Sequence, residues 1–251
     1  LKEGAKKVFK FKSCVHFNQT FNLLVYMMDY KKQLTTIKEQ YDNIGVVVID
    51  NFLDVEKANK IYNLFDKCNN FDYINQVRER HYSTSIKNNI ETLPDEAEIY
   101  TAQFNKSSTL SNNDAIGDFL DSVKLSANQY SDEKIRFYTK PLCYKMVAGN
   151  HLRVHTDLYA GEFGYTYYLC KDWKWDWGGI VNYYIEQDET IIPIIPKFNR
   201  IVLRHEKIKL NHFVSTVEKH ALCNRYTING WGSTVDLSEQ SKHKIIGEYS
   251  E

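Results

Sequence analysis

Short strand-like runs fill the second half of the chain. From about Lys134 onward, eight or nine such runs are separated by turns: KIRFYTK, CYKMVAG, HLRVHTD, GYTYYLC, GIVNYYIE, TIIPIIP, RIVLRHE, HFVSTVE and NRYTINGW. Their number and spacing are typical of a β-sandwich or a closed barrel, and differ from those of a parallel sheet with crossover helices. We therefore expect a mainly β fold with flanking helices.

Helical periodicity is confined to the first half. Apolar residues recur at helical spacing in KKQLTTIKEQYDN, which ends near Asn43, in VEKANKIYNLFDKC, which Asp54 is placed to cap, and from Asn113 to Tyr130. A β-branched run, GVVVIDNFL, comes just before the second of these segments and predicts a strand.

Residues 69–113 follow neither pattern for long. They are polar and have little periodicity apart from strand-like pieces near Tyr73 to Val77. Connecting segments of this kind run over the surface and often carry function. We expect loops with interspersed strands that form one wall or a lid of a site.

The composition fits a globular protein with one main domain. The 251 residues are 43% hydrophobic and 25% charged, which is sufficient to bury a substantial core. We divide the chain into an N-terminal helical segment over residues 1–44, a domain over 45–235 with its core at about 134–232, and a polar tail over 236–251.

Charge and cysteine usage narrow the class of protein. The 32 basic and 32 acidic residues cancel, so no global field draws the chain to nucleic acid or to an anionic membrane. The apolar run FNLLVYMMDY is too short to span a bilayer. Five cysteines, odd in number and scattered, indicate reduced thiols rather than a disulfide framework. We expect a soluble cytoplasmic protein.

A possible metal site begins in the run HLRVHTD. In an extended strand residues i and i+2 point to one face, so His155 and Asp157 would present an imidazole and a carboxylate side by side. Taken alone, a His-x-Asp triplet is more often a solvated strand end or a capped turn. A metal site requires a third ligand.

Three histidines downstream are candidates for that ligand. His212 is favoured because it opens the strand HFVSTV after a turn, whereas His205 lies within a strand and His220 in a polar link. Two histidines and one carboxylate would leave several positions of an octahedral ion open, as in non-haem Fe(II) oxygenases. Zinc hydrolases use a similar ligand set, so the three residues alone do not define the chemistry.

Arg225 favours the oxygenase interpretation. On the next strand, NRYTINGW, it would direct a bidentate guanidinium into the same pocket, where a carboxylate cosubstrate could bind. Tyr168 could add a phenol donor, since strand alternation places it on the face of Thr166 and Gly164, away from Tyr167. The alternatives are a surface salt bridge for Arg225 and core packing for Tyr168.

Residues 144–232 resemble the catalytic core of the 2-oxoglutarate- and Fe(II)-dependent dioxygenases, and within them the prolyl hydroxylase group. The motifs in order are MVA, H-x-D, YYLCKDW, GG, IPKFNRIVL, NHFV and NRYTINGW. They are most similar to the hypoxia-inducible-factor prolyl hydroxylases, and the NGW ending is closer to the ribosomal-protein prolyl hydroxylases. GVVVIDNFLDVEKANKIYNLF also resembles the strand and helix that open many such domains.

The resemblance implies a double-stranded β-helix, the jelly roll of cupin-like proteins. It also implies that His155, Asp157 and His212 hold Fe(II), with 2-oxoglutarate as cosubstrate, O2 as oxidant and ascorbate as a supporting reductant. Together with Arg225, these are the residues on which catalysis would depend.

The resemblance further implies that Arg225 and Tyr168 bind the distal carboxylate of 2-oxoglutarate. Thr227, two residues on and on the same face, could add a hydrogen bond. The chain departs from the pattern in a shorter segment before the H-x-D motif, where Gly149 replaces a tyrosine, and in a longer link from His212 to Arg225. His151 is an alternative ligand if the site is loose.

The run WKWDW allows two interpretations. If it were a strand, its three tryptophans would share a face and form a stacking platform for a sugar or a peptide. Packing between strands is the favoured alternative, and Arg153 and Arg204 are likewise interpreted as surface or ion-pair residues rather than substrate clamps.

The functional hypothesis is hydroxylation of an unactivated C–H bond on a prolyl residue of a protein or peptide, with release of succinate and CO2. One alternative keeps this chemistry but acts on a free amino acid or a small metabolite such as a sugar derivative. Another is a β-barrel protein that binds a metal or a carboxylate without turnover.

Overall fold

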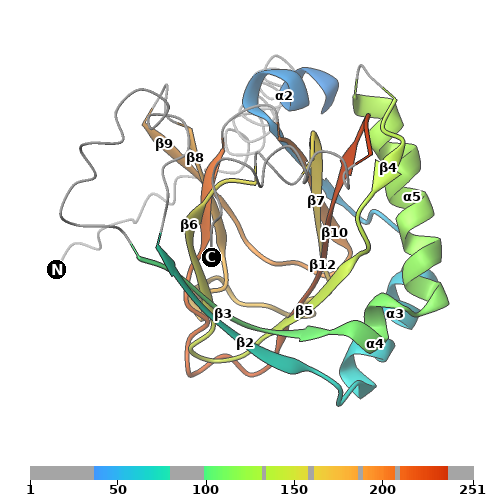
Figure 1. The fold of residues 1–251 in the computed structure, drawn as a ribbon. Helices are drawn as coiled ribbons and strands as arrows, with labels where there is room; N and C mark the ends of the chain where they lie inside the picture. Colours follow the sequence, from blue (N-terminus) through green and yellow to red (C-terminus); the bar gives the residue numbers. More distant parts are fainter. Residues whose placement is uncertain are drawn as a thin grey trace, which may run out of the picture.

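Twelve antiparallel strands form one strongly curled sheet in the computed structural model, which describes residues 37–79, 99–131, 134–157, 161–185, 189–206 and 210–236 (Figure 1). The strands are β1 (Val46–Asp50), β2 (Asp72–Glu79), β3 (Ile99–Ser107), β4 (Phe137–Tyr138), β5 (Leu142–Met146), β6 (His151–His155), β7 (Phe163–Tyr168), β8 (Val181–Ile185), β9 (Thr190–Ile194), β10 (Arg200–His205), β11 (Asn211–Val214) and β12 (Arg225–Ser233). Each of the nine runs after Lys134 contains a strand, so the mainly β prediction is confirmed.

The strand order shows a jelly roll. Along the sheet it runs β1-β10-β7-β12-β5-β3-β6-β11-β8-β9, with β2 paired to β3 and β4 to β12. The curl brings β6, β11 and β8 opposite β10, β7 and β12, so that two walls enclose an interior (Figure 1). This arrangement is the expected double-stranded β-helix.

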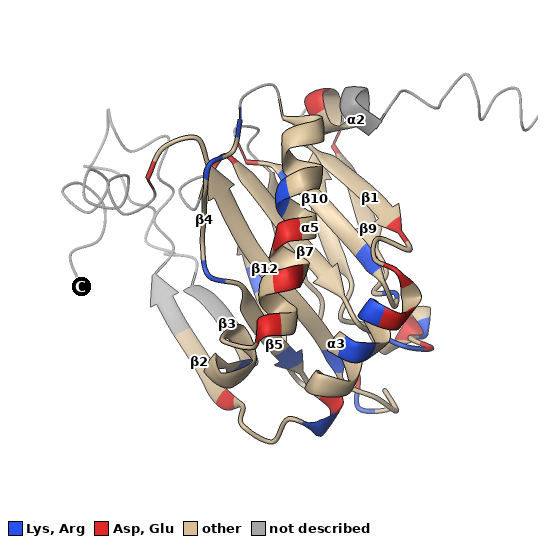
Figure 2. Ribbon diagram, turned by 90° about the vertical axis from the view of Figure 1, so that its right-hand side faces the viewer, with Lys and Arg blue, Asp and Glu red and all other residues tan. Residues whose placement is uncertain are grey.

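Helices cover the outer face of one wall. The two that do so are α3 (Val55–Lys67) and α5 (Asp114–Tyr130); the other helical elements described are α2 (Ile37–Ile44), α4 (Ser108–Ser111) and the 3-10 turn η2 (Trp175–Trp177). Figure 2 shows α3 and α5 lying across β7, β10 and β12. The predicted cap is present, because the Asp54 carboxylate accepts a hydrogen bond from the Glu56 amide at 2.8 Å. None of the helices in the described ranges is long and apolar enough to cross a membrane.

Alternation along β7 separates two hydrophobic clusters. Tyr165 and Tyr167 pack in the outer cluster, together with the buried faces of α3 and α5. Tyr168 belongs to the inner cluster, with Met146 and Val202. The predicted opposition of Tyr167 and Tyr168 is therefore confirmed, and it makes the inner face of β7 part of the barrel interior.

Two segments take shapes that the local pattern left open. Strand β3 falls within residues 69–113, where loops with interspersed strands were expected to form one wall or a lid, and it lies inside the sheet between β5 and β6, with Ala102 and Phe104 buried. The WKWDW run is a turn rather than a strand. Trp173 and Trp177 are buried and pack edge to face with ring centroids 5.4 Å apart, as the favoured packing interpretation expects. Trp175 is 75% exposed, so no three-ring platform forms.

Several predictions fall partly outside the described residues. They concern most of the N-terminal segment (1–36), part of the expected wall or lid (80–98) and most of the polar tail (237–251). The domain boundaries stay a prediction.

Candidate active site

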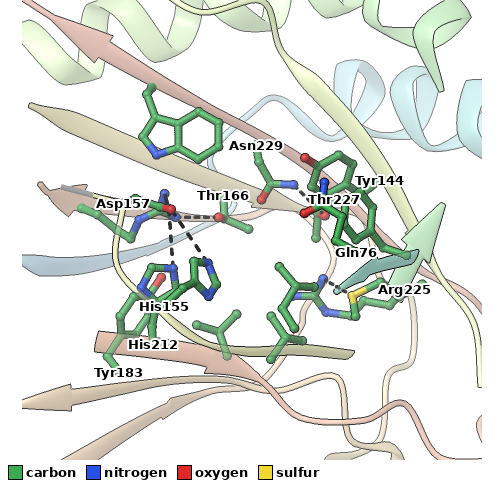
Figure 3. A pocket seen from close by; sticks show the side chains of 17 residues that line it. Gln76, Tyr144, His155, Asp157, Thr166, Tyr183, His212, Arg225, Thr227 and Asn229 are labelled. Carbon is green, nitrogen blue, oxygen red and sulfur yellow. Dashed lines mark hydrogen bonds and ion pairs between the residues drawn. The ribbon is translucent and has the colours of Figure 1, made fainter. Parts of the chain in front are cut away.

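Two strands and the residues after them bring three potential metal ligands together. His155 ends β6, and its register partner on the neighbouring strand β11 is His212, so their rings lie side by side with centroids 4.3 Å apart. Asp157 follows β6 by two residues, with Oδ1 at 3.8 Å from His155 Nε2 and Oδ2 at 3.6 Å from His212 Nε2. The ligand atoms of the three residues all lie within 4.8 Å of one another (Figure 3).

Both imidazoles are held by the backbone. His155 Nδ1 lies 2.8 Å from the Arg153 carbonyl oxygen, and His212 Nδ1 lies 2.9 Å from the Leu210 carbonyl oxygen. A carbonyl only accepts, so each Nδ1 carries a proton, and each Nε2 is the nitrogen that faces Asp157. Hydrogen bonding of the second ring nitrogen is the usual device for orienting a histidine ligand.

The electrostatics favour the protonation states that a metal needs. Loss of hydration in the cavity lowers the pKa of His155 to about 4, and the neighbouring His212 adds to this effect. Burial would raise the pKa of Asp157, but the hydrogen bond and charges of His212, His155 and Arg204 hold it well below its usual range. At neutral pH His155 is therefore neutral and Asp157 is ionised, which are the forms that bind a metal.

The other candidate histidines lie elsewhere. His205 packs its ring against Tyr41 at 4.9 Å, and His220 is exposed, 3.5 Å from Asp176. His151 Nδ1 is 3.2 Å from the Gly149 carbonyl oxygen, and its ring is not part of the three-residue group. Among the described histidines, only His212 approaches His155 and Asp157.

A cavity of about 370 Å³ connects this group to Arg225. Its lining comes from both walls of the barrel and includes the alternate residues Arg225, Thr227, Asn229 and Trp231 of β12. Figure 3 shows the three potential ligands at one side of the cavity and Arg225 at the other. The size suits a small organic acid together with part of a substrate.

Arg225 is a buried cation without an anionic partner among the described residues. Its Nε donates to the Gly179 carbonyl oxygen at 2.7 Å, its Nη1 lies 3.3 Å from Met146 Sδ, and its guanidinium carbon is 5.2 Å from the Tyr168 ring centroid. A Cβ on Gly179 would come within 2.8 Å of Arg225 Cδ, so this glycine leaves room for the side chain. A buried charge normally has a counter-charge, so this guanidinium suits a ligand carboxylate.

Two hydroxyls lie beside Arg225. Tyr168 is register partner of Thr227, and its buried hydroxyl has no hydrogen-bond partner among the described residues. Burial raises the pKa of Tyr168, so the phenol is a donor at neutral pH. Thr227 lines the cavity and accepts from Asn229 Nδ2 at 3.1 Å, which leaves its own hydroxyl proton to donate.

Sequence reasoning missed the role of Arg204. The ion-pair interpretation is correct, but the residue is buried and lines the cavity, and its Nη2 donates to Asp157 Oδ2 at 3.1 Å. One signal was present in the sequence: Glu206, at i+2, shares its side of the chain and can pair with it.

Comparisons with known proteins agree with this geometry. Residues 142–233 match the model of the 2OG-Fe(II) oxygenase superfamily, and this segment includes the three potential ligands and Arg225. A search of curated proteins finds no significant match.

The fold is similar to those of solved prolyl hydroxylases. One is a prolyl hydroxylase from Trichoplax adhaerens in complex with a hypoxia-inducible-factor peptide fragment, at a TM-score of 0.58 and 18% identity, covering 89% of this chain and 97% of that chain. Another is a prolyl-4-hydroxylase from Pseudomonas putida, at a TM-score of 0.54 and 16% identity, covering 78% of this chain and 96% of that chain. Over residues 142–233, the chain is similar to the 2OG-Fe(II) oxygenase superfamily.

Proposed function

We propose that the chain is an Fe(II)- and 2-oxoglutarate-dependent dioxygenase, in which His155, Asp157 and His212 hold the iron. The donor set fits this metal: two imidazole nitrogens and one carboxylate leave open positions for a chelating cosubstrate and O2. Zinc would accept the same three ligands, so the ligands alone do not carry the proposal. The observation that carries it is the buried Arg225 in the same cavity, which has no anionic partner among the described residues.

In this proposal Arg225 binds the distal carboxylate of 2-oxoglutarate, and the hydroxyls of Tyr168 and Thr227 donate to it. The Gly179 carbonyl and the Tyr168 ring hold the guanidinium in place before the ligand arrives, which lowers the entropic cost of binding. When bound, iron and 2-oxoglutarate supply the oxidative chemistry: O2 is consumed, 2-oxoglutarate becomes succinate and CO2, and a substrate C–H bond becomes C–OH. The chain itself orients the cosubstrate and limits access of water.

The substrate in this proposal is a prolyl residue of a protein or peptide. Two observations support it: the motif order resembles that of prolyl hydroxylases, and the solved structures with a similar fold include prolyl hydroxylases, one of them in complex with a peptide fragment.

The first experiment measures succinate formation by the purified protein with Fe(II), 2-oxoglutarate and ascorbate. We expect slow succinate production by the wild type and background levels for His155→Ala and Arg225→Ala. Arg153→Ala is the matched control, because it removes an exposed arginine from the same strand as His155 and should keep the wild-type rate. A wild type that makes no succinate and binds neither Fe(II) nor 2-oxoglutarate would refute the proposal.

The substrate is tested separately, by mass spectrometry. Proline-containing peptides incubated with the complete system should gain the mass of one oxygen atom on a prolyl residue, and should raise succinate formation above the uncoupled rate. Hydroxylation of free amino acids or sugar derivatives instead of peptides would keep the chemistry and overturn the prolyl substrate.

A further inference from the structure

A buried chain of charges lies behind the proposed metal site. Arg204 and Glu206 are only 3% and 2% exposed. The Arg204 guanidinium donates in three directions: Nε to Glu206 Oε1 at 2.8 Å, Nη1 to Thr166 Oγ1 at 2.9 Å, and Nη2 to Asp157 Oδ2 at 3.1 Å. Glu206, Arg204 and Asp157 thus form a carboxylate, guanidinium, carboxylate series that ends on the residue proposed to bind iron.

The backbone opposite leaves room for this series. Gly164 on β7 is the register partner of Arg204 on β10. A Cβ at Gly164 would lie 2.0 Å from Glu206 Oε1 and 2.7 Å from Arg204 Nη2. A side chain at this position would shift the ends of Arg204 and Glu206, so the glycine leaves the room in which Arg204 reaches Asp157.

Stability alone is a weak explanation for such a pair. Removing charges from water costs several kcal/mol for each ion, and a buried ion pair is often no more stabilising than apolar residues of similar volume. A purely apolar interior would have been available, since Val202 on the same face of β10 belongs to the inner hydrophobic cluster. The hydrogen bond from Arg204 to Asp157 indicates a role at the proposed metal site instead.

We propose that Arg204 is a positioning residue for Asp157. By holding Oδ2, which also lies 3.6 Å from His212 Nε2, Arg204 fixes the rotation of the carboxylate and directs Oδ1 toward His155 Nε2. Glu206 in turn holds Arg204 and offsets its positive charge, which would otherwise cancel that of Asp157 and oppose a divalent cation. This inference rests on the proposed metal site, but not on the identity of the substrate.

The test is Co(II) binding by the apoprotein, followed by titration and by the visible absorption spectrum of the bound ion. The variant is Arg204→Met with Glu206→Gln, which removes both charges together so that neither is left buried alone. Loss of a residue that orients a metal ligand typically weakens metal binding about 10- to 100-fold. We expect a loss of this size and an altered Co(II) spectrum.

Arg200→Met is the matched control for this variant. Arg200 lies on the same strand and pairs with Asp50 at 2.7 Å, away from the cavity, so its loss should leave the Co(II) affinity and spectrum unchanged. Circular dichroism establishes that each protein is folded.

A second variant, Gly164→Ala, disturbs the Arg204–Glu206 pair without removing a charge. Gly164→Ala should displace Arg204 and weaken Co(II) binding, whereas Gly117→Ala, in α5 where a Cβ meets nothing within 4 Å, should not. If the double variant fails to fold, the comparison of Gly164→Ala with Gly117→Ala tests the positioning role of Arg204.

The outcomes separate the two proposals. Unchanged Co(II) affinity and spectrum in a folded double variant, or in Gly164→Ala if the double variant is unfolded, would overturn the positioning role and leave the metal site intact. A wild type that binds no Co(II) would overturn the metal site itself.

Discussion

Tyr167 and Tyr168 are adjacent in the sequence, yet they serve opposite sides of β7. The Tyr167 hydroxyl donates to Asn199 Oδ1 at 2.9 Å in the outer layer, whereas the Tyr168 hydroxyl is buried in the interior without a partner among the described residues. Buried phenols usually find a hydrogen-bond partner, so the unpaired one indicates where a ligand oxygen would fit.

Replacing Tyr168 by phenylalanine should weaken 2-oxoglutarate binding. A hydrogen bond to a charged group contributes about 1.5–3 kcal/mol, so the dissociation constant should rise roughly 10- to 150-fold. The measurement is calorimetric titration of 2-oxoglutarate into the Mn(II)-loaded protein, since Mn(II) replaces Fe(II) without turnover.

Tyr167→Phe provides the control at the neighbouring position. It should cost about 1 kcal/mol of unfolding free energy, from the lost bond to Asn199, and should not change 2-oxoglutarate affinity. Equal 2-oxoglutarate affinity in Tyr168→Phe and wild type would show that Tyr168 serves only as packing.

The sequence predicted individual site residues unevenly, for a physical reason. The inward direction of Tyr168 and Thr227 follows from alternation within one strand, which is local. The contact of Arg204 with Asp157 depends on the packing of β10 across Gly164 and on the path of the chain after β6, neither of which is visible in a local pattern.

At the scale of elements, the side chain of Asn199 forms hydrogen bonds with two segments that are distant in the sequence. This residue precedes β10 and is 3% exposed with a positive φ of 59°. Its side-chain amide donates to the Leu53 carbonyl oxygen at 2.7 Å and accepts from the Leu53 amide and the Tyr167 hydroxyl, each at 2.9 Å. It therefore ties the corner between β1 and α3 to the end of β7, next to the proposed cosubstrate site.

Replacing Asn199 by alanine should destabilise the fold strongly. Three lost hydrogen bonds at about 1 kcal/mol each, and a positive φ that costs alanine a further 1–2 kcal/mol, give about 4–5 kcal/mol. Urea denaturation measures this loss as a lower midpoint at an unchanged slope.

Asn51→Ala separates the two contributions. Asn51 has a similar φ of 54° but is exposed, so its replacement should cost only the conformational term of about 1–2 kcal/mol. Similar losses for the two variants would show that the Asn199 hydrogen bonds contribute nothing to stability.

Element types were easier to predict than their pairing. Strand-like runs with turns between them identified the later strands, and apolar residues at helical spacing identified the helices α3 and α5, with Asp54 as the cap of α3. The inclusion of β3 within the sheet could not be predicted, because Phe104 and Ala102 are buried by pairing with β5 and β6, which come later in the sequence. The turn at WKWDW replaces the strand alternative because Trp173 bends back to donate to the Gly178 carbonyl oxygen.

At the scale of the whole molecule, the cavity connects the two walls of the barrel. His155 and His212 belong to β6 and β11, whereas Arg225 and Tyr168 belong to β12 and β7 on the opposite wall. A metal alone would join only β6, β11 and the segment after β6. A metal with 2-oxoglutarate would connect both walls through one bound ligand, so the two should stabilise the fold more together than either does alone.

Thermal unfolding tests this expectation. A ligand at about 100 times its dissociation constant adds about 2.7 kcal/mol, which for a protein of this size raises the melting temperature by roughly 5–10 °C. We expect a shift of this size with Mn(II) and 2-oxoglutarate together, a smaller one with Mn(II) alone, and almost none with 2-oxoglutarate alone. Chelation of the metal should reverse the shift, and His212→Ala should abolish it. If 2-oxoglutarate raised the melting temperature equally without Mn(II), the cosubstrate would be held by Arg225 and its neighbours alone, and the two walls would not be linked through the metal.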